Sequence, residues 1–404
     1  MPSATTTRQA RVTRLPARER SASGSLFLLL IAVCTAVTAA NIYLAAPLLP
    51  LIADDFGTVP SAVAWIASVA QLGYAAGLLF FAPLGDRVDR RRLVAGLSVA
   101  TTLALLVAAV APGSAALAAA VFVAAAATVI PQLLVPLVAA RAPADRRARH
   151  VAAVIAGLFT GIVAARVLGG LTGQALGWRW VFGGSAVLTL ALGLATAAAL
   201  PAERRVRQGG LFSGLAELPG VLRRSPELRR ACLRQAGMFG AWSALWTSLA
   251  LLLTGPAYGL STATAGLFGL FGLTASAVAP LAGGLVDRFG AARVVGTAYV
   301  LAAVAVPLFW LGGQRLPALF AAAVAIHAAL VASHVANQTL ALTTTSTPAT
   351  ANTAYVVSGF AGGALASLAA GPAFGHWGWG GVCAVAGAWL ALGWGATAAR
   401  AGRR

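Results

Sequence analysis

The sequence predicts an all-α membrane protein with twelve transmembrane helices in two pseudo-symmetric six-helix bundles. Of the 404 residues, 59% are hydrophobic and only 10% are charged, whereas a soluble domain has about 25% charged residues. The apolar residues form blocks, each close to the roughly 20 residues with which a helix crosses a hydrocarbon core of about 30 Å. Two unlike motifs also recur at one constant offset along the chain.

Both motifs recur after 201 residues. An Asp-Arg pair at 86–87 returns at 287–288, each time directly after a long apolar stretch. A Gly-Trp pair at 177–178 returns at 378–379. One offset shared by two motifs indicates a duplicated membrane unit, which is how many secondary transporters are built.

Twelve apolar segments follow a polar, arginine-rich stretch at the start of the chain. They are predicted at 25–49, 61–84, 93–112, 115–140, 151–175, 179–200, 231–254, 262–285, 291–312, 316–341, 351–375 and 378–399. Their length and their Gly and Ala content exclude β-barrel strands, which have about 9–11 alternating residues. Because backbone polar groups in lipid must be satisfied within the segment, each is predicted to be a helix. The first segment lacks a clear cleavage motif and is interpreted as a retained helix.

Positive charge is distributed very unequally between the two sides of the predicted membrane. The net charge is +19, and all 29 basic residues are arginine. With twelve crossings, 26 arginines fall on the side of both tails, Arg179 and Arg315 fall on the opposite side, and Arg166 lies inside a helix. The positive-inside rule therefore predicts a multi-pass protein of the cytoplasmic (plasma) membrane with both termini in the cytoplasm. No basic patch with interleaved aromatic residues forms a separate module, so we expect no nucleic-acid partner.

The longest polar interval separates six helices from six. The predicted units are a cytoplasmic tail at 1–24, a first bundle at 25–200, a linker at 201–230, a second bundle at 231–399 and a short tail at 400–404. The linker is rich in Arg, Gly and Pro. Residues 211–233 mix apolar residues with arginines, which suits an amphipathic helix on the membrane face or, equally, a solvated tether.

Little in the sequence suits a metal, a cofactor or an enzyme. Cys34, Cys232 and Cys383 have neither metal-type nor disulfide-type spacing. Four histidines and ten acidic residues leave little material for a metal site, and the acidic pair at 54–55 has no His or Cys beside it. A primary pump is disfavoured because the chain has no phosphate-binding Gly-Lys loop and no lysine.

The two Asp-Arg stretches carry a family resemblance. They read APLGDRVDRRR at 82–92 and GGLVDRFGAAR at 283–293. They resemble the cytoplasmic loop motif of the major facilitator superfamily, Gly-x-Leu-x-Asp-Arg-x-Gly-Arg-Arg/Lys. The second copy matches through Gly290, whereas Ala82 and Asp89 replace glycines in the first. Residues 46–57 and the stretches LGGLTG and GWRWVF at 168–182 are similar to bacterial efflux-type members, arabinose-efflux-like or drug:proton antiporters.

This resemblance covers the chain from the first helix to the last and implies the major facilitator fold. It implies a secondary transporter that exports a small organic compound (drug, sugar or metabolite) by proton antiport; the alternative is a facilitator or importer on the same fold. The expected partners are a small-molecule substrate, protons and the lipid bilayer, and the expected state is a monomer. The motif itself says almost nothing about the substrate.

In the family, the motif residues form a gate. The residues that match here are Asp86, Arg87, Arg90, Asp287, Arg288 and Gly290. Asp86 is then expected to face the positive N-terminus of the eleventh helix and Asp287 that of the fifth. Breaking these contacts would let the halves rock about a central site. The alternative is that 86–92 is only a solvated loop that sets topology.

Arg166 is the most unusual single residue, because it lies mid-span in the fifth helix. An arginine there costs about 2.5 to 3.5 kcal/mol on insertion scales and should face the bundle interior. Efflux-type relatives often carry an Arg in the fourth helix, whereas here 115–140 has no charge. Arg166 is therefore either a residue for a substrate anion or for coupling, or a structural Arg tied to backbone carbonyls.

A second polar stripe lies on the tenth helix. His327, His334 and Gln338 are seven and eleven residues apart and fall near one line, with Asn337 nearby. One histidine can carry a coupled proton, or the stripe can serve interhelical hydrogen bonds. No Asp or Glu lies deep in a span. Further cavity candidates are Asn41, Tyr43, Gln71, Tyr74, Gln132, Trp242 and Trp246.

Overall fold

A computed structural model describes residues 17–86, 88–141, 147–200, 213–343 and 348–398, and within them the chain is helical with no strand. The helices of the first half are α1 Ala17–Ala40, α2 Ala45–Asp55, α3 Pro60–Val63, α4 Trp65–Phe80, η1 Ala82–Asp86, α5 Arg90–Ala109, α6 Ser114–Ala127, α7 Ile130–Arg141, α8 Arg147–Leu176 and α9 Trp178–Ala199. Those that follow are α10 Ser213–Arg224, α11 Pro226–Thr254, α12 Thr262–Leu267, η2 Phe268–Gly272, α13 Leu273–Phe289, α14 Ala291–Leu311, α15 Leu316–Thr343 and α16 Pro348–Ala398.

The helices provide the twelve predicted crossings. Within the described ranges, ten helical segments are long and apolar enough to span a membrane, and α1 with α2 forms an eleventh, bent by 42°. The 51 residues of α16 would extend roughly 75 Å at about 1.5 Å per residue, too far for one crossing. The non-helical Gly378 divides α16 in two, which gives twelve.

The repeated Gly-Trp pair performs the same task in each half. Gly177 and Gly378 both have positive φ, 94° and 57°, which a residue without a Cβ adopts at no steric cost. Each glycine ends one spanning helix and starts the next, and the tryptophans that follow, Trp178 and Trp379, are both buried. Trp379 Nε1 donates a hydrogen bond to the Phe309 carbonyl at 2.6 Å. The predicted turns at both positions are confirmed.

The Asp-Arg repeat shows why its two copies differ in sequence. Asp89 is the N-cap of α5, and its carboxylate accepts a hydrogen bond from the Arg91 backbone N–H at 3.0 Å. Gly290 occupies the same place before α14 with φ 83°. The Asp89 side chain accepts a hydrogen bond from a backbone N–H that has no partner within the helix, whereas Gly290 has no side chain that could do so. Both copies therefore start a helix at the same register.

Two details of the spans differ from the sequence predictions, and the linker adopts one of its two predicted alternatives. The first span breaks at residues 41–44, between α1 and α2. In the linker, the helical alternative forms as α10, which packs on α11 and α16 through Leu218 and Val221. The seventh span begins at Pro226, five residues before its predicted start, because Ser225 caps α11 by accepting from the Leu228 N–H at 3.2 Å.

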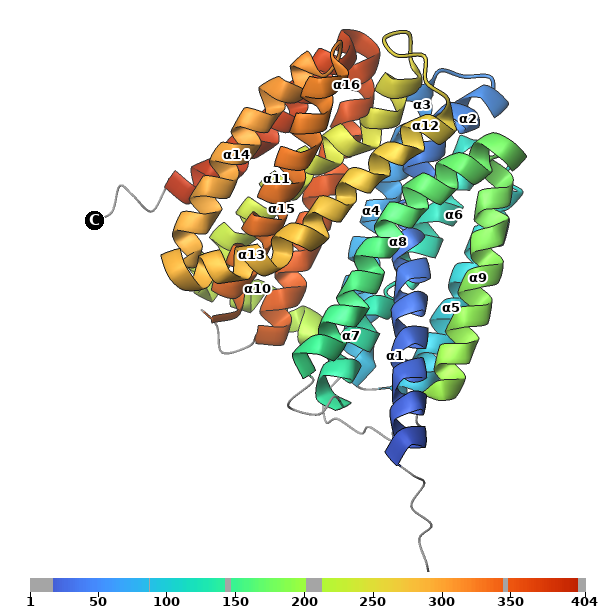
Figure 1. Ribbon diagram of the computed structural model, residues 1–404, viewed down its shortest axis with the longest axis vertical. Helices are drawn as coiled ribbons and strands as arrows, with labels where there is room; N and C mark the ends of the chain where they lie inside the picture. The colour runs from blue at the N-terminus through green and yellow to red at the C-terminus, as the bar shows by residue number, and fades with distance from the viewer. Residues whose placement is uncertain (1–16, 87, 142–146, 201–212, 344–347, 399–404) are drawn as a thin grey trace, which may run out of the picture.

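The two halves meet at one end of the molecule and diverge toward the other. Figure 1 shows the first half in blue to green and the second in yellow to red, converging where α2, α12 and the bend of α16 lie. The contacts between the halves include those of α8 with α12, η2 and α13, of α4 and α3 with α16, and of α2 with α11 and α12. We call this the α2–α12 end, and the opposite end, where α7 ends in Arg141 and α5 begins in Arg90, the arginine-rich end.

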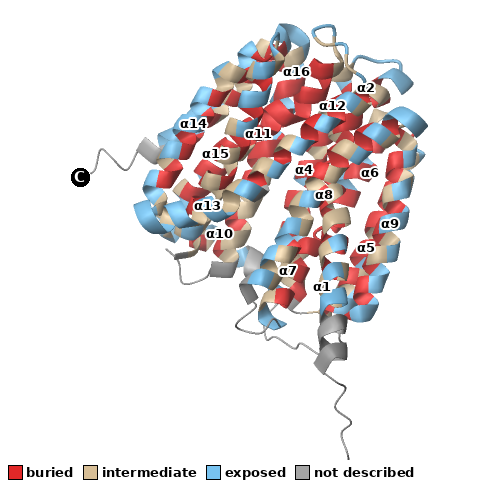
Figure 2. Cartoon of the chain, viewed as in Figure 1, coloured by how far each residue is buried: buried red, intermediate tan, exposed pale blue. Residues whose placement is uncertain are grey.

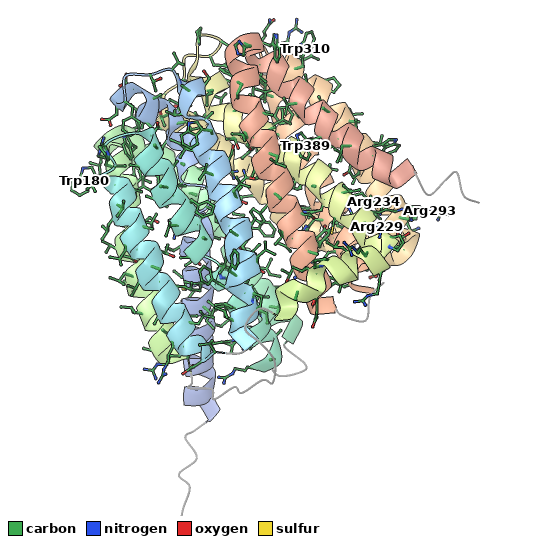
Figure 3. The ribbon with its side chains drawn as sticks, turned by 180° about the vertical axis from the view of Figure 1, so that it is seen from behind. Trp180, Arg229, Arg234, Arg293, Trp310 and Trp389 are labelled. Carbon is green, nitrogen blue, oxygen red and sulfur yellow. The ribbon has the colours of Figure 1, made fainter. Side chains whose placement is uncertain are left out.

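The outer surface is apolar, as a lipid-facing surface requires. Figure 2 shows exposed residues along the outer faces of α5, α9 and α14. These faces carry large apolar side chains, among them Leu103, Val107, Val187, Leu188, Val300 and Val304. Near the α2–α12 end, the exposed side chains of Trp180 and Trp310 project outward (Figure 3). Tryptophan gathers at membrane–water interfaces, so these rings mark the edge of the membrane.

Candidate functional site

Arg166 lies within α8 at the junction of the two halves. Its side chain is 7% exposed. The guanidinium carbon lies 5.3 Å from the ring centroid of Tyr43, 5.3 Å from that of Trp242 and 5.5 Å from that of Trp246. All three distances are within the roughly 6 Å range of a cation–π interaction. Arg166 therefore sits among three aromatic rings, and together with His327 we call these residues the arginine cage.

The cage is built from both halves. Arg166 and Tyr43 belong to the first half, and Tyr43 lies at the break between α1 and α2. Trp242 and Trp246 are one turn apart on α11, with nearly parallel rings whose centroids are 6.2 Å apart. His327 on α15 places its ring edge-on to Trp246, at 4.5 Å between centroids. A movement that separates the halves at this level must therefore open the cage.

His327 holds the tryptophan pair in place through a defined tautomer. Trp242 Nε1 donates to His327 Nε2 at 3.2 Å, and His327 Nδ1 lies 2.8 Å from the Ala323 carbonyl. An indole N–H only donates and a carbonyl only accepts, so Nδ1 carries the hydrogen and Nε2 accepts. In this conformation His327 is the neutral imidazole.

Arg166 has no anion beside it. Its Nη1 is buried without a hydrogen-bond partner, and no acidic side chain in the described part of the chain pairs with it. The Nε1 of Trp246 is also a buried donor without a partner. Cation–π contacts contribute about 0.5 to 2 kcal/mol each, which offsets only part of the cost of burying a charge. The cage thus presents surplus donors and no acceptor for them.

Two small cavities adjoin Arg166. One, of about 20 Å³, is lined by Pro47, Leu249 and Phe268 together with Arg166 and Trp246. The other, of about 10 Å³, lies beside Gln71 and Thr247 and is also lined by Arg166 and Trp246. A cavity needs at least about 10–15 Å³ to hold one water. The site is therefore closed in this conformation and admits a ligand only when its walls move.

Glycines hold α8 against α12 and η2 next to the cage. A Cβ on Gly170 would lie 2.8 Å from the Thr262 carbonyl oxygen, and a Cβ on Gly269 would lie 2.6 Å from the Cβ of Arg166. The Gln174 side-chain oxygen accepts from the Thr262 N–H at 3.2 Å and so caps α12 from the other half. Closure of the α2–α12 end and the position of Arg166 are consequently linked through one helix contact.

The stripe on the tenth helix does not form one site. His334 lies 3.4 Å from the Tyr355 hydroxyl through Nδ1. Asn337 accepts from Arg234 at 3.5 Å, and Gln338 donates to the Asn352 side chain at 2.9 Å. His327 and His334 are separated by about 10.5 Å of helix rise. Of the four, only His327 belongs to the arginine cage.

The remaining polar candidates lie in different surroundings. Asn41 donates to Thr189 at 3.0 Å and to Thr128 at 3.3 Å, and it accepts from Ser185 at 2.6 Å, all within the first half. These three bonds tie the break after α1 to α9 and to the turn between α6 and α7. Asn41 is therefore placed as a structural residue.

Two glutamines and one tyrosine lie closer to the cage and to the junction. Gln71 accepts from Ser243 across the halves at 3.1 Å and lines the smaller cavity. Gln132 donates to the Tyr74 hydroxyl at 3.2 Å. The Tyr74 ring packs on Phe360 of the second half, at 4.6 Å between centroids.

The gating residues lie toward the arginine-rich end. Arg87 and the Asp86 side chain are outside the described atoms, and Arg90 is buried at the start of α5. Asp287 is exposed at the end of α13 and makes no ion pair among the described residues. Arg288 lies over the ring of its neighbour Phe289, 5.1 Å from the centroid. Among the described residues, no hydrogen bond or ion pair joins Asp287 to the fifth helix, α8, whose start follows the undescribed residues 142–146.

Sequence reasoning did not single out Arg234, although it lies within the predicted span 231–254. Arg234 is 3% exposed within α11, and its backbone carbonyl accepts from the Tyr299 hydroxyl at 2.5 Å. Figure 3 shows it near Arg229 on the same helix. The Ser-Pro-Glu sequence at 225–227 was the available signal, because it is typical of a helix start.

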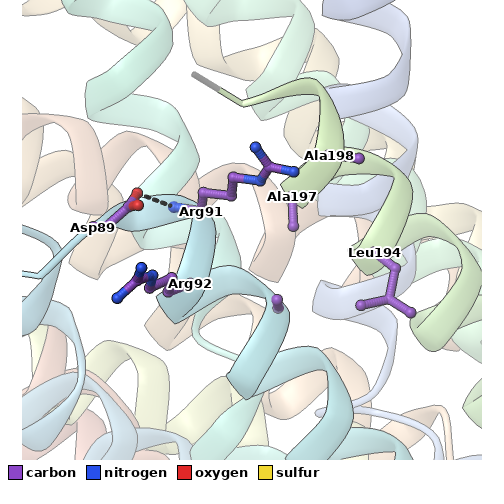
Figure 4. A pocket seen from close by; sticks show the side chains of 7 residues that line it. Asp89, Arg91, Arg92, Leu194, Ala197 and Ala198 are labelled. Atoms are coloured by element: carbon purple, nitrogen blue, oxygen red, sulfur yellow. Dashed lines mark hydrogen bonds between the residues drawn. The ribbon is translucent and has the colours of Figure 1, made fainter. Parts of the chain in front are cut away.

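A larger pocket lies elsewhere, between the start of α5 and the end of α9 (Figure 4). Its volume is about 420 Å³, and its lining combines Arg91 and Arg92 with the apolar side chains of Leu194 and Ala197. It is on the arginine-rich side of the first half and shares no residue with the cage.

Twelve crossings, two repeated halves and a closed polar site at their junction define a membrane transporter. The chain belongs to the Major Facilitator Superfamily, whose family model matches residues 31–254. It is 75% identical to a probable transporter of Streptomyces coelicolor, over all of this chain and 96% of that protein.

Two more distant relatives match over most of the chain. An uncharacterized transporter of Escherichia coli O157:H7, YgaY, is 33% identical over 90% of this chain and 93% of its own length. A chloramphenicol resistance protein of Streptomyces lividans is 31% identical over 65% of this chain and 67% of its own length.

Solved structures share the fold. The nucleoside transporter NupG has a TM-score of 0.74 at 14% identity, covering 92% of this chain and 99% of NupG. An inward-facing, occupied bacterial homolog of the human lysosomal transporter Spinster has a TM-score of 0.72 at 17% identity, covering 93% and 95% of the two chains.

Proposed function

We propose that the protein is a monomeric secondary transporter that exports a small organic compound across the cytoplasmic membrane by alternating access, in exchange for protons. The observation that carries this proposal is the arginine cage, a buried charged site whose walls come from both halves. Such a site opens to one side or the other as the halves rock. The similarity to a chloramphenicol resistance protein favours export of an organic compound.

The arginine-rich end is proposed to face the cytoplasm, as the positive-inside rule favours. The halves converge at the α2–α12 end, where α8 contacts the second half from Val163 to Gln174. Closer to its start, α8 packs instead on α1, through Gly157 and Gly161. The present conformation then corresponds to a state that is closed toward the outside, in which no described residue forms an ion pair with Asp287.

Proton coupling is assigned to the tenth helix, because no carboxylate lies deep in a span. His327 and His334 both lie inside the second half and each touches a hydrogen-bonding side chain. Protonation of His327 at Nε2 would place two N–H groups against each other, so it requires the bond from Trp242 to break. A proton on this residue is thereby linked to the geometry of the cage.

Flux in proteoliposomes tests the proposal, with a neutral compound, chloramphenicol, and an anionic one, benzoate, as the first probes, of which at least one should be transported. We expect uptake into vesicles that expose the cytoplasmic face outward, driven by an acidic vesicle interior. The double variant His327→Asn/His334→Asn should lose the response to the pH gradient, whereas the control His376→Asn, an exposed histidine at the α2–α12 end, should keep it. Downhill flux that ignores the gradient would favour the facilitator or importer alternative.

A further inference from the structure

We infer that the transported compound carries one anionic group, a carboxylate or its equivalent, that binds Arg166, and an apolar or aromatic body that packs against Trp242 and Trp246. This inference rests on the proposed transport function and specifies the class of its substrate. It follows from the charge, the free donors and the lining of the cage.

The charge balance of the cage calls for an anion. Arg166 is 93% buried at the junction of the halves, and no carboxylate in the described ranges compensates it. A buried guanidinium without a counter-ion is unfavourable, and charged groups in membrane spans typically mark substrate or ion pathways. Its planar donor fork matches the two oxygens of a carboxylate.

The cage also leaves two donors without partners beside its cavities. The two donors of the cage without partners, Arg166 Nη1 and Trp246 Nε1, belong to residues that line both cavities, as Ala46 also does. An anion between them satisfies both at once. A neutral ligand leaves the guanidinium charge uncompensated, so the cage discriminates between an acid and its amide.

The lining specifies the rest of the ligand. Pro47, Leu249 and Phe268 complete the larger cavity, and Ile42 lines the smaller one beside Trp242. These are apolar groups next to large aromatic faces, the usual lining of a site for an amphipathic organic molecule. A chloride ion shares the anionic chemistry but makes no use of this lining, so the two sources of negative charge can be separated by experiment.

Binding to the purified full-length protein tests the inference through tryptophan fluorescence. The probes are three matched acid and amide pairs: benzoate with benzamide, phenylacetate with phenylacetamide, and indole-3-acetate with indole-3-acetamide. Potassium chloride is titrated separately at constant ionic strength. We expect at least one acid to bind tenfold or more tightly than its amide, and chloride to compete only weakly.

Three variants locate the site. Arg166→Gln should reduce acid affinity at least tenfold and leave amide binding unchanged. Trp246→Phe, which keeps the ring and removes the N–H, should weaken acid binding several-fold. The control Arg315→Gln, at an exposed arginine outside the cage, should match the wild type. If Arg166→Gln does not fold, the inference is tested by the acid–amide comparison in the wild type and by the loss of acid affinity in Trp246→Phe.

The inference is overturned if amides bind as tightly as acids, if no acid binds, or if chloride alone accounts for the signal. Failure of transport gives a different pattern. If chloramphenicol flux is equal in the wild type and in Arg166→Gln, and neither protein binds acids better than amides, the transport function stands and the anion-binding inference is rejected. If acids bind to the protein but neither acids nor chloramphenicol are transported, the anion site stands and the proposed transport function is rejected.

Discussion

The contact between Gly170 and α12 offers a direct test of how the α2–α12 end is held closed. In Gly170→Ala, the added Cβ would lie 2.8 Å from the Thr262 carbonyl oxygen and 3.1 Å from the Gly266 Cα. Both are backbone atoms of the other half, so relief requires α8 and α12 to separate. Overpacking typically costs about 1–3 kcal/mol, and because only the closed state bears this cost, the ratio of closed to open molecules should fall about 5- to 150-fold.

Cysteine accessibility measures that ratio. Thr262→Cys replaces a side chain that is 4% exposed in the closed state, and the three native cysteines are buried, so background labelling is low. A membrane-impermeant maleimide added from the α2–α12 side should label Thr262→Cys faster when Gly170→Ala is present.

Two glycines of the same kind serve as controls in the same background. A Cβ on Gly161 would overlap the Ala36 carbonyl inside the first half, so Gly161→Ala should lower thermal stability without changing labelling. Gly296 faces open space, and Gly296→Ala should change neither beyond a gain of up to about 1 kcal/mol in helix stability. Equal labelling in Gly170→Ala and Gly296→Ala would refute the claim that this contact closes the α2–α12 end.

Three further substitutions test single contacts. Asp89→Ala removes the N-cap of α5 and should lower stability by about 0.5–2 kcal/mol in thermal unfolding, whereas the exposed Asp287→Ala should stay within about 0.5 kcal/mol of the wild type. Asn41→Ala leaves the hydroxyls of Thr189 and Ser185 without their partner and should lower the free energy of unfolding by about 1–3 kcal/mol, with acid binding unchanged. Trp242→Phe keeps a ring over Arg166 but removes the hydrogen bond to His327. A double-mutant cycle with His327→Phe should give a coupling free energy of unfolding of about 0.5–1.5 kcal/mol. A coupling of zero would contradict the hydrogen bond.

The fold was predictable because its signals are local. Segment length and apolar content define each crossing. The glycines at 177 and 378 mark turns, because each adopts the positive φ that its turn requires. The break after α1 has one local signal, Pro47, which cannot donate to the carbonyl of Tyr43, and the prediction of an unbroken first span did not use it. That break is held by hydrogen bonds from Asn41 to Thr128 and Thr189, partners 87 and 148 residues away, and no local pattern reports them.

The site was predictable as residues but not as an arrangement. A mid-membrane arginine and a pair of tryptophans one turn apart are unusual enough to be singled out, yet their spacing along the chain does not indicate that they touch. The spacing of the tenth-helix stripe suggested one polar face. The structure divides it because α15 is 28 residues long and passes different neighbours along its length. Periodicity reports which side of a helix a residue is on, and the neighbours at each level decide what it does.

The duplication explains why one half supplies the charge. The offset of 201 residues relates Gly177 to Gly378, and eleven residues earlier it relates Arg166 to Ser367. Ser367 is buried and shares a hydrogen bond of 3.1 Å with Thr247, so the second half fills this level with a neutral pair. The turns must be the same in both halves because each half has to fold, whereas a binding site at the junction needs only one cation. Positions that have the same residue in both halves therefore serve folding. Arg166 has no arginine at the equivalent position of the second half, and we expect the ligand to be recognised there.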